Sequence, residues 1–128
     1  MTDQEFLTAF EQHTLTEFPH RSHIRMAWLY LRASGWERGQ EQIRQGIQQF
    51  AAALGADRKY HETITVFWAR LVNHAINCDP GIDSFDVFIE RYPFLLNGKL
   101  QASHYSRDLI ASEAARQRWI EPDLLPLP

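Results

Sequence analysis

Apolar side chains recur at helical spacing along most of the chain, and no stretch shows the alternation of a strand. In the most apolar stretch, Ile64, Trp68 and Leu71 fall on one side of a predicted helix, with His61 at its head. The pattern predicts an all-α protein, a single-domain bundle of about five to six helices. We expect the main helices at residues 20–33, 37–54, 59–77 and 106–120, and shorter ones near 3–12 and 85–91.

Turn and capping residues set the predicted ends of these helices. Thr2 and Glu5 have the spacing of a capping box, in which each side chain caps the other residue's backbone N–H. Gly35 and Gly55 are expected to end the helices that precede them. The prolines of residues 121–128 predict an extended, apolar tail, which either folds back over its own domain or docks on a second copy.

Two glycines, Gly39 and Gly46, lie inside the predicted helix 37–54 on the face that carries Ile43 and Phe50. Each glycine costs on the order of 1 kcal/mol of helix propensity relative to alanine. We therefore expect a neighbouring helix to approach this face closely.

Polar residues stand at the first turn of two predicted helices. His20 and His23 open the helix at 20–33 and, because they are three positions apart, share one of its faces. His61 and Glu62 open the helix at 59–77, but as adjacent residues they diverge by about 100° and cannot both point straight inward. The dipole of a helix disfavours a cation at its start, which favours neutral imidazoles at these positions.

The short links at residues 34–36 and 55–58 make consecutive helices antiparallel neighbours. The first and third of the three central helices then begin at the same end of the bundle. We therefore predict one polar pocket there, formed by His20, His23, His61 and Glu62.

Three imidazoles around an open coordination position suit a divalent metal (Zn, Fe, Mn or Ni) in a catalytic role. In this hypothesis the metal ligands are His20, His23 and His61. The catalytic candidates are Glu62, as a base on bound water, and Tyr60, as a hydrogen-bond donor. The reaction class would be metal-assisted hydrolytic or redox chemistry on a small-molecule ligand.

The same residues have a second interpretation, because histidines near helix starts often donate to a carbonyl group and Glu62 offsets the helix dipole. The alternative is a non-enzymatic ligand-binding or partner-binding helical module with structural histidines, for which a homodimer stays open. We expect His13, His74 and His104 to be surface or supporting groups. The lone Cys78 is expected to be a passive buried thiol.

Composition narrows the class of partner. Apolar residues make up 45% of the chain and charged residues 23%, and the net charge is −3, which argues against nucleic acid or an anionic membrane as the partner. One cysteine allows no internal disulfide and fits a reducing compartment. Neither a signal peptide nor a stretch of transmembrane length is visible, so we expect a cytoplasmic protein.

The chain resembles a family of small, all-helical bacterial proteins to which no function is assigned. The resemblance covers most of the chain, and its most specific part is Tyr60-His61-Glu62-Thr63-Ile64-Thr65 with Trp68. The other parts are Phe18-Pro19-His20-Arg21-Ser22-His23 with Ala27-Trp28, Ala115-Arg116, and Trp119-Ile120-Glu121-Pro122-Asp123-Leu124. The resemblance implies that both histidine clusters belong to the family's pattern, and it brings no activity, cofactor or substrate.

Overall fold

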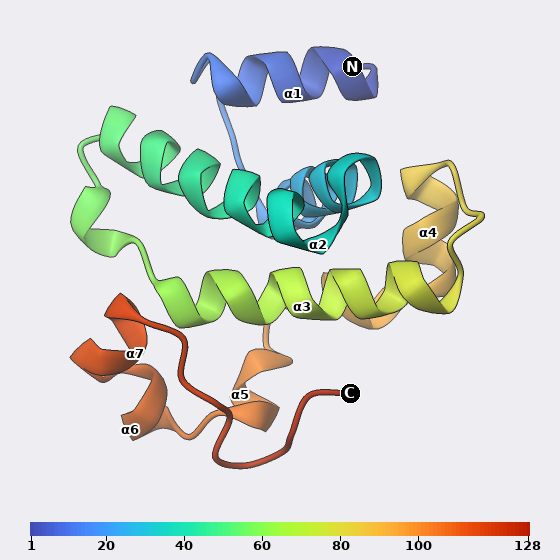
Figure 1. Cartoon of the computed structure of the whole chain (residues 1–128). Helices are drawn as coiled ribbons and strands as arrows, with labels where there is room; N and C mark the ends of the chain where they lie inside the picture. The colour runs from blue at the N-terminus through green and yellow to red at the C-terminus, as the bar shows by residue number, and fades with distance from the viewer. The chain divides into compact units, whose positions relative to one another are not determined.

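The computed structural model describes all 128 residues, and every regular element in it is helical, which confirms the all-α class (Figure 1). The chain forms two compact units, Met1–Tyr60 and His61–Pro128. Whether these units behave as one domain stays a prediction. No helix combines the length and the apolar character that crossing a lipid bilayer requires.

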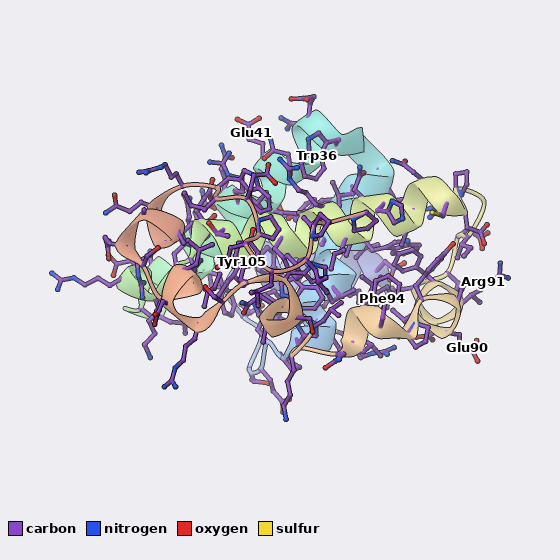
Figure 2. The ribbon with its side chains drawn as sticks, turned by 90° about the horizontal axis from the view of Figure 1, so that it is seen from below. Trp36, Glu41, Glu90, Arg91, Phe94 and Tyr105 are labelled. Atoms are coloured by element: carbon purple, nitrogen blue, oxygen red, sulfur yellow. The ribbon has the colours of Figure 1, made fainter.

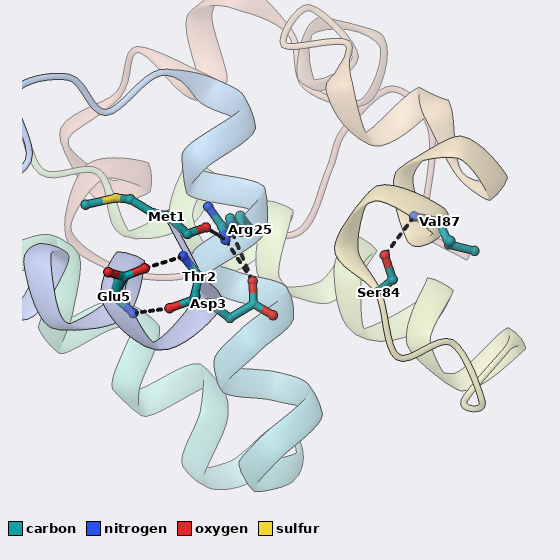
Figure 3. A network of polar contacts seen from close by, with 7 residues as sticks. All are labelled: Met1, Thr2, Asp3, Glu5, Arg25, Ser84 and Val87. Carbon is teal, nitrogen blue, oxygen red and sulfur yellow. Dashed lines mark hydrogen bonds and ion pairs between the residues drawn. The ribbon is translucent and has the colours of Figure 1, made fainter.

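The first unit contains α1 (Asp3–Glu11), α2 (His20–Ala53) and the 3₁₀-helix η1 (Asp57–Lys59). The predicted capping box begins α1: the Thr2 hydroxyl accepts from the Glu5 N–H at 3.1 Å, and the Glu5 carboxylate accepts from the Thr2 N–H at 2.8 Å (Figure 3). Arg25 ties this end of α1 to α2, because its guanidinium donates to Asp3 Oδ1 at 2.8 Å and to the Met1 carbonyl at 3.2 Å. Local capping and one cross-helix ion pair thus hold α1.

A kink at Gly35 divides α2 into the two helices that the sequence predicts. Gly35 has φ 77° and ψ −177°, a conformation that residues with a Cβ rarely adopt. After the kink the chain packs against the turn before it: a Cβ placed on Gly39 would lie 2.9 Å from the Leu31 Cα. The predicted close approach at this glycine is therefore confirmed. Pro19 is the N-cap of α2 and stands just before the first helical position.

The core of the first unit is built around Phe10, whose side chain is 1% exposed. Its ring stacks on Phe18 at a centroid distance of 5.0 Å and on Phe50 at 5.7 Å. Gly46 leaves the room for this ring, because a Cβ on Gly46 would lie 2.7 Å from the Phe10 Cε2 atom. The predicted apolar stripe of the helix before the kink is buried as well: Ile24, Ala27, Trp28 and Leu31.

The second unit contains five α-helices and one 3₁₀-helix: α3 (Glu62–Cys78), α4 (Phe85–Arg91), η2 (Pro93–Leu96), α5 (Gln101–His104), α6 (Arg107–Ile110) and α7 (Glu113–Gln117). The predicted helix at 85–91 is present, capped by Ser84, whose hydroxyl accepts from the Val87 N–H at 3.4 Å (Figure 3). The predicted start of α3 at residue 59 is wrong, because His61 is its N-cap.

The single helix predicted for residues 106–120 is wrong, and α6 and α7 stand in its place. Ser112 separates them: its hydroxyl donates to the Leu109 carbonyl at 2.7 Å and accepts from the Ala115 N–H at 3.2 Å. A serine side chain that bonds the local backbone competes with continuous helical bonding, and here it caps a new helix instead.

The buried face of α3 is wider than its predicted stripe. Leu71, Val72 and Ala75 are buried as expected, whereas Ile64 and Trp68 are only half-buried. Phe67 is fully buried, with its ring 5.9 Å from that of Tyr105 in a T-shaped contact. A helix covered on more than one side buries residues outside a single stripe, which a one-face pattern does not reveal.

The tail, residues 121–128, is not helical, as predicted, and it returns past α5 (Figure 1). The Leu124 N–H donates to the His104 carbonyl at 2.9 Å, and the His104 ring Nδ1 lies 2.9 Å from the Leu125 carbonyl. The Asp123 carboxylate accepts from the Ser106 N–H at 2.7 Å, and its hydrogen bonds with Ser106 lower the pKa of this carboxyl. The tail therefore packs on its own unit.

Candidate functional site

The His61 ring joins two distant parts of the second unit. Its Nδ1 accepts from the Ile64 N–H at 3.1 Å, the contact that caps α3. A neutral ring that accepts at Nδ1 carries its proton on Nε2, and this atom lies 2.8 Å from the Ile110 carbonyl at the end of α6. Both nitrogens of this candidate ligand thus form hydrogen bonds with backbone groups of its own unit.

The two threonines of the same motif are structural partners as well. The Thr63 hydroxyl donates to the Arg118 carbonyl at 2.7 Å and accepts from the Ile120 N–H at 3.2 Å, and the residue is 0% exposed. The Thr65 hydroxyl donates to the His61 carbonyl at 2.8 Å, within the first turn of α3. We call the contacts of His61 and Thr63 with residues 110–120 the α3 clamp.

Aromatic residues surround the α3 clamp. The Tyr105 hydroxyl donates to the Ile120 carbonyl, and its ring meets that of Trp119 at 6.4 Å in a T-shaped contact. The Arg70 guanidinium lies over the Trp119 ring, 4.4 Å from its centroid. Burial raises the pKa of the Tyr105 phenol, so it stays a neutral donor at ordinary pH. Figure 2 labels this tyrosine among the densely packed side chains.

His23 is a half-buried residue of the first unit. Its Nδ1 lies 3.2 Å from the Pro19 carbonyl, one turn back, and its ring centroid is 4.0 Å from that of Phe18. Burial lowers the pKa of this imidazole, and the nearby His20 lowers it further. The ring is therefore neutral near pH 7, and with its proton on Nδ1 its Nε2 carries the lone pair.

The predicted pocket draws on both units. His20, His23 and Tyr60 belong to the first unit, whereas His61 and Glu62 belong to the second, so their meeting at one site stays a prediction. Glu62 is the first residue of α3, where its carboxylate offsets the positive end of the helix dipole. The structure contains no group of three or more histidine, cysteine, aspartate or glutamate side chains that could hold a metal ion.

Two residues lie close together near the end of α3, and His74 is exposed, as expected of a surface group. Cys78 is exposed, against the expectation of a buried thiol, because it is the last residue of α3, beyond the buried face that ends at Ala75. His74 has Cys78 as its partner, with 3.6 Å between Nε2 and Sγ. Their spacing of four residues is a signal for one helix face, although the predicted helix 59–77 ends one residue before Cys78.

Comparisons with models of protein families, with curated proteins and with solved structures found no match. The resemblance to a family of small helical bacterial proteins therefore stays a prediction.

Proposed function

We propose that this protein is a non-enzymatic helical module that binds another protein chain, and that the Tyr-His-Glu-Thr motif holds its second unit together. One observation carries the structural role of the motif: His61 Nδ1 caps α3, and its Nε2 bonds the Ile110 carbonyl in the α3 clamp. A side chain in that position has a complete structural role without a metal or a substrate.

Metal binding by His61 would require one of these hydrogen bonds to break. Coordination through Nδ1 removes the cap from Ile64, which costs about 0.5–2 kcal/mol in comparable helices. Coordination through Nε2 deprives the Ile110 carbonyl of its donor, at about 1–3 kcal/mol where the carbonyl is shielded from water. The fold therefore opposes a ligand role for this residue.

Exposed apolar side chains on α4 and η2 supply a surface for a protein partner. Val87 is 44% exposed, Phe94 40% and Leu96 38%. The Phe94 ring contacts Tyr92 at a centroid distance of 6.4 Å, and Tyr92 contacts the buried Phe88 at 5.4 Å, so ring contacts link Phe94 to the core. Figure 2 labels Phe94 together with the charged Glu90 and Arg91. Anchored aromatic residues beside charged ones are typical of protein-binding surfaces, and the net charge of −3 disfavours a polyanion there.

Thermal unfolding and metal analysis of protein purified without an affinity tag test the structural role of the histidines. We expect a chelator to leave the Tm of the wild type unchanged, and the H23A/H61A double variant to have the same lowered Tm with and without chelator. The contrary result is a stoichiometric metal in the wild type that the double variant lacks.

Sedimentation over a range of concentrations tests the binding surface, with a second copy of the chain as the probe. We expect reversible self-association that the F94S/L96S double variant weakens at least tenfold. The exposed E90Q variant, on the same helical segment, is the control and should associate as the wild type does. A wild type that stays monomeric throughout rejects a second copy as the partner.

A divalent-metal site of His20, His23 and His61, with Glu62 and Tyr60 beside it, is the second candidate. One observation favours it: His20 and His23 stand three residues apart at the start of α2, and burial lowers the pKa of His23, so its imidazole is neutral near pH 7. Neutral imidazole is the form that binds metals. This candidate requires His61 to leave the α3 clamp, and the metal analysis above decides between the two.

A further inference from the structure

His74 and Cys78 form a pair of metal-binding side chains that the candidate site leaves unused. They lie four residues apart on the last turns of α3, and both are exposed. Their donor atoms, Nε2 and Sγ, are 3.6 Å apart. The two side chains therefore already converge on one point of the surface.

This separation matches the edge of a tetrahedral zinc site. Zinc binds a thiolate sulfur at about 2.3 Å and an imidazole nitrogen at about 2.0–2.1 Å, so tetrahedral angles put the two donors about 3.6 Å apart. Zinc entry would need the hydrogen bond between the pair to open, with little movement of either donor atom. The thiol must also lose its proton, so binding strengthens as the pH rises.

The surroundings favour a cation. Cys78 is the last residue of a helix of 17 residues, and the carboxyl end of a helix carries partial negative charge. Asp79 follows in the chain, but its carboxylate accepts from Arg91 at 2.6 Å and is committed to that ion pair. Because Asp79 is engaged with Arg91, His74 and Cys78 are the two protein ligands, and two coordination positions of a tetrahedral ion stay open.

We propose that His74 and Cys78 chelate Zn²⁺ at the carboxyl end of α3. The soft thiolate and the imidazole together select zinc over magnesium or calcium, which prefer oxygen ligands. Water or a donor from outside the chain fills the two open positions. This site is separate from His20, His23 and His61 and does not depend on the proposed function.

Cobalt titration of the full chain, reduced with a non-coordinating phosphine, tests the proposal, because a thiolate bound to Co²⁺ gives a charge-transfer band in the near ultraviolet. We expect the wild type to develop this band and zinc to bleach it. The C78S variant should show no band. The H74A variant should need about a hundredfold more cobalt, since a chelate gains on this order over one donor.

Two further variants separate the site from other sources of signal. N77A, at an exposed neighbour on the same turn, should titrate as the wild type does. H23A/H61A should also keep the band, so a failure of the proposed function leaves this result intact. A wild type without a band at excess cobalt, or an H74A variant with unchanged affinity, overturns the proposal.

Discussion

At the scale of single residues, His61 shows how one imidazole can serve both as a helix cap and as a tie between helices. Its Nδ1 belongs to the start of α3, and its Nε2 belongs to the end of α6. The sequence identified this residue as special from its place at the head of an apolar helix. Its partner is 49 positions away and offers only a backbone carbonyl, which no local pattern encodes.

Two substitutions of His61 separate its two hydrogen bonds. Asparagine is a good N-cap, so His61→Asn keeps the cap of α3 but loses the donor to the Ile110 carbonyl. We expect this loss to lower the free energy of unfolding by about 1–2 kcal/mol. His61→Ala loses both hydrogen bonds, and we expect it to lower the free energy of unfolding, measured from urea midpoints, by about 2–3 kcal/mol. Equal destabilisation by the two variants would show that the cap contributes nothing.

The neutral state of His23 predicts a dependence of stability on pH. Burial lowers the pKa of this ring below its usual value of about 6.5, so the unfolded chain takes up the proton first as the pH falls. The contribution of neutral His23 to the free energy of unfolding is complete above about pH 6.5. This contribution is lost as the pH falls from there toward the lowered pKa. Urea midpoints at about pH 7.5 and about pH 5.5 should differ less in H23Q than in the wild type. An unchanged difference in H23Q assigns the effect to other groups.

At the scale of elements, local signals predicted those helix starts and breaks that depend on residues within one turn. The capping box of Thr2 and the kink at Gly35 both follow from residues within one turn. The break at Ser112 did not, because serine is tolerated inside helices and only its contacts with Leu109 and Ala115 show the choice. Close packing at Gly46 was predicted, although its partner Phe10 was not.

Gly46→Ala tests this packing. The added methyl group would lie 2.7 Å from a ring that Phe18 and Phe50 hold in place, so we expect about 1–3 kcal/mol of destabilisation despite the better helix propensity of alanine. Gly81→Ala is the control, because a Cβ there meets nothing within 4 Å. A Gly46→Ala variant more stable than the wild type would show that Phe10 moves aside freely.

At the scale of the whole molecule, the chain consists of two compact units that meet in sequence between Tyr60 and His61. The sequence predicted the helical class and the helices on either side of this boundary. It did not predict the boundary itself, because residues 55–58 read as a short loop inside one bundle. The predicted metal pocket draws its residues from both units, and a local sequence pattern does not encode how distant residues meet.

Limited digestion with trypsin tests this division. Arg58 and Lys59 are exposed in η1, a single turn of 3₁₀-helix next to the boundary, and such a turn opens at low cost. We expect the first cuts after these residues, before those within α2 or α3, as followed by mass spectrometry. The R58Q/K59Q variant should lose these early cuts, and first cleavage inside α3 would contradict the division.

The α3 clamp also sets an order of events during protein synthesis. The start of α3 is fastened by backbone groups 49, 55 and 57 positions further along the chain. When the ribosome has just made α3, the backbone groups that bond its start have not yet been synthesised. Residues 1–60, the whole first unit, have already been made. During synthesis, amino-terminal units generally fold before those that follow them in the chain. The start of α3 therefore acquires its full set of clamp hydrogen bonds only after residue 120 has emerged.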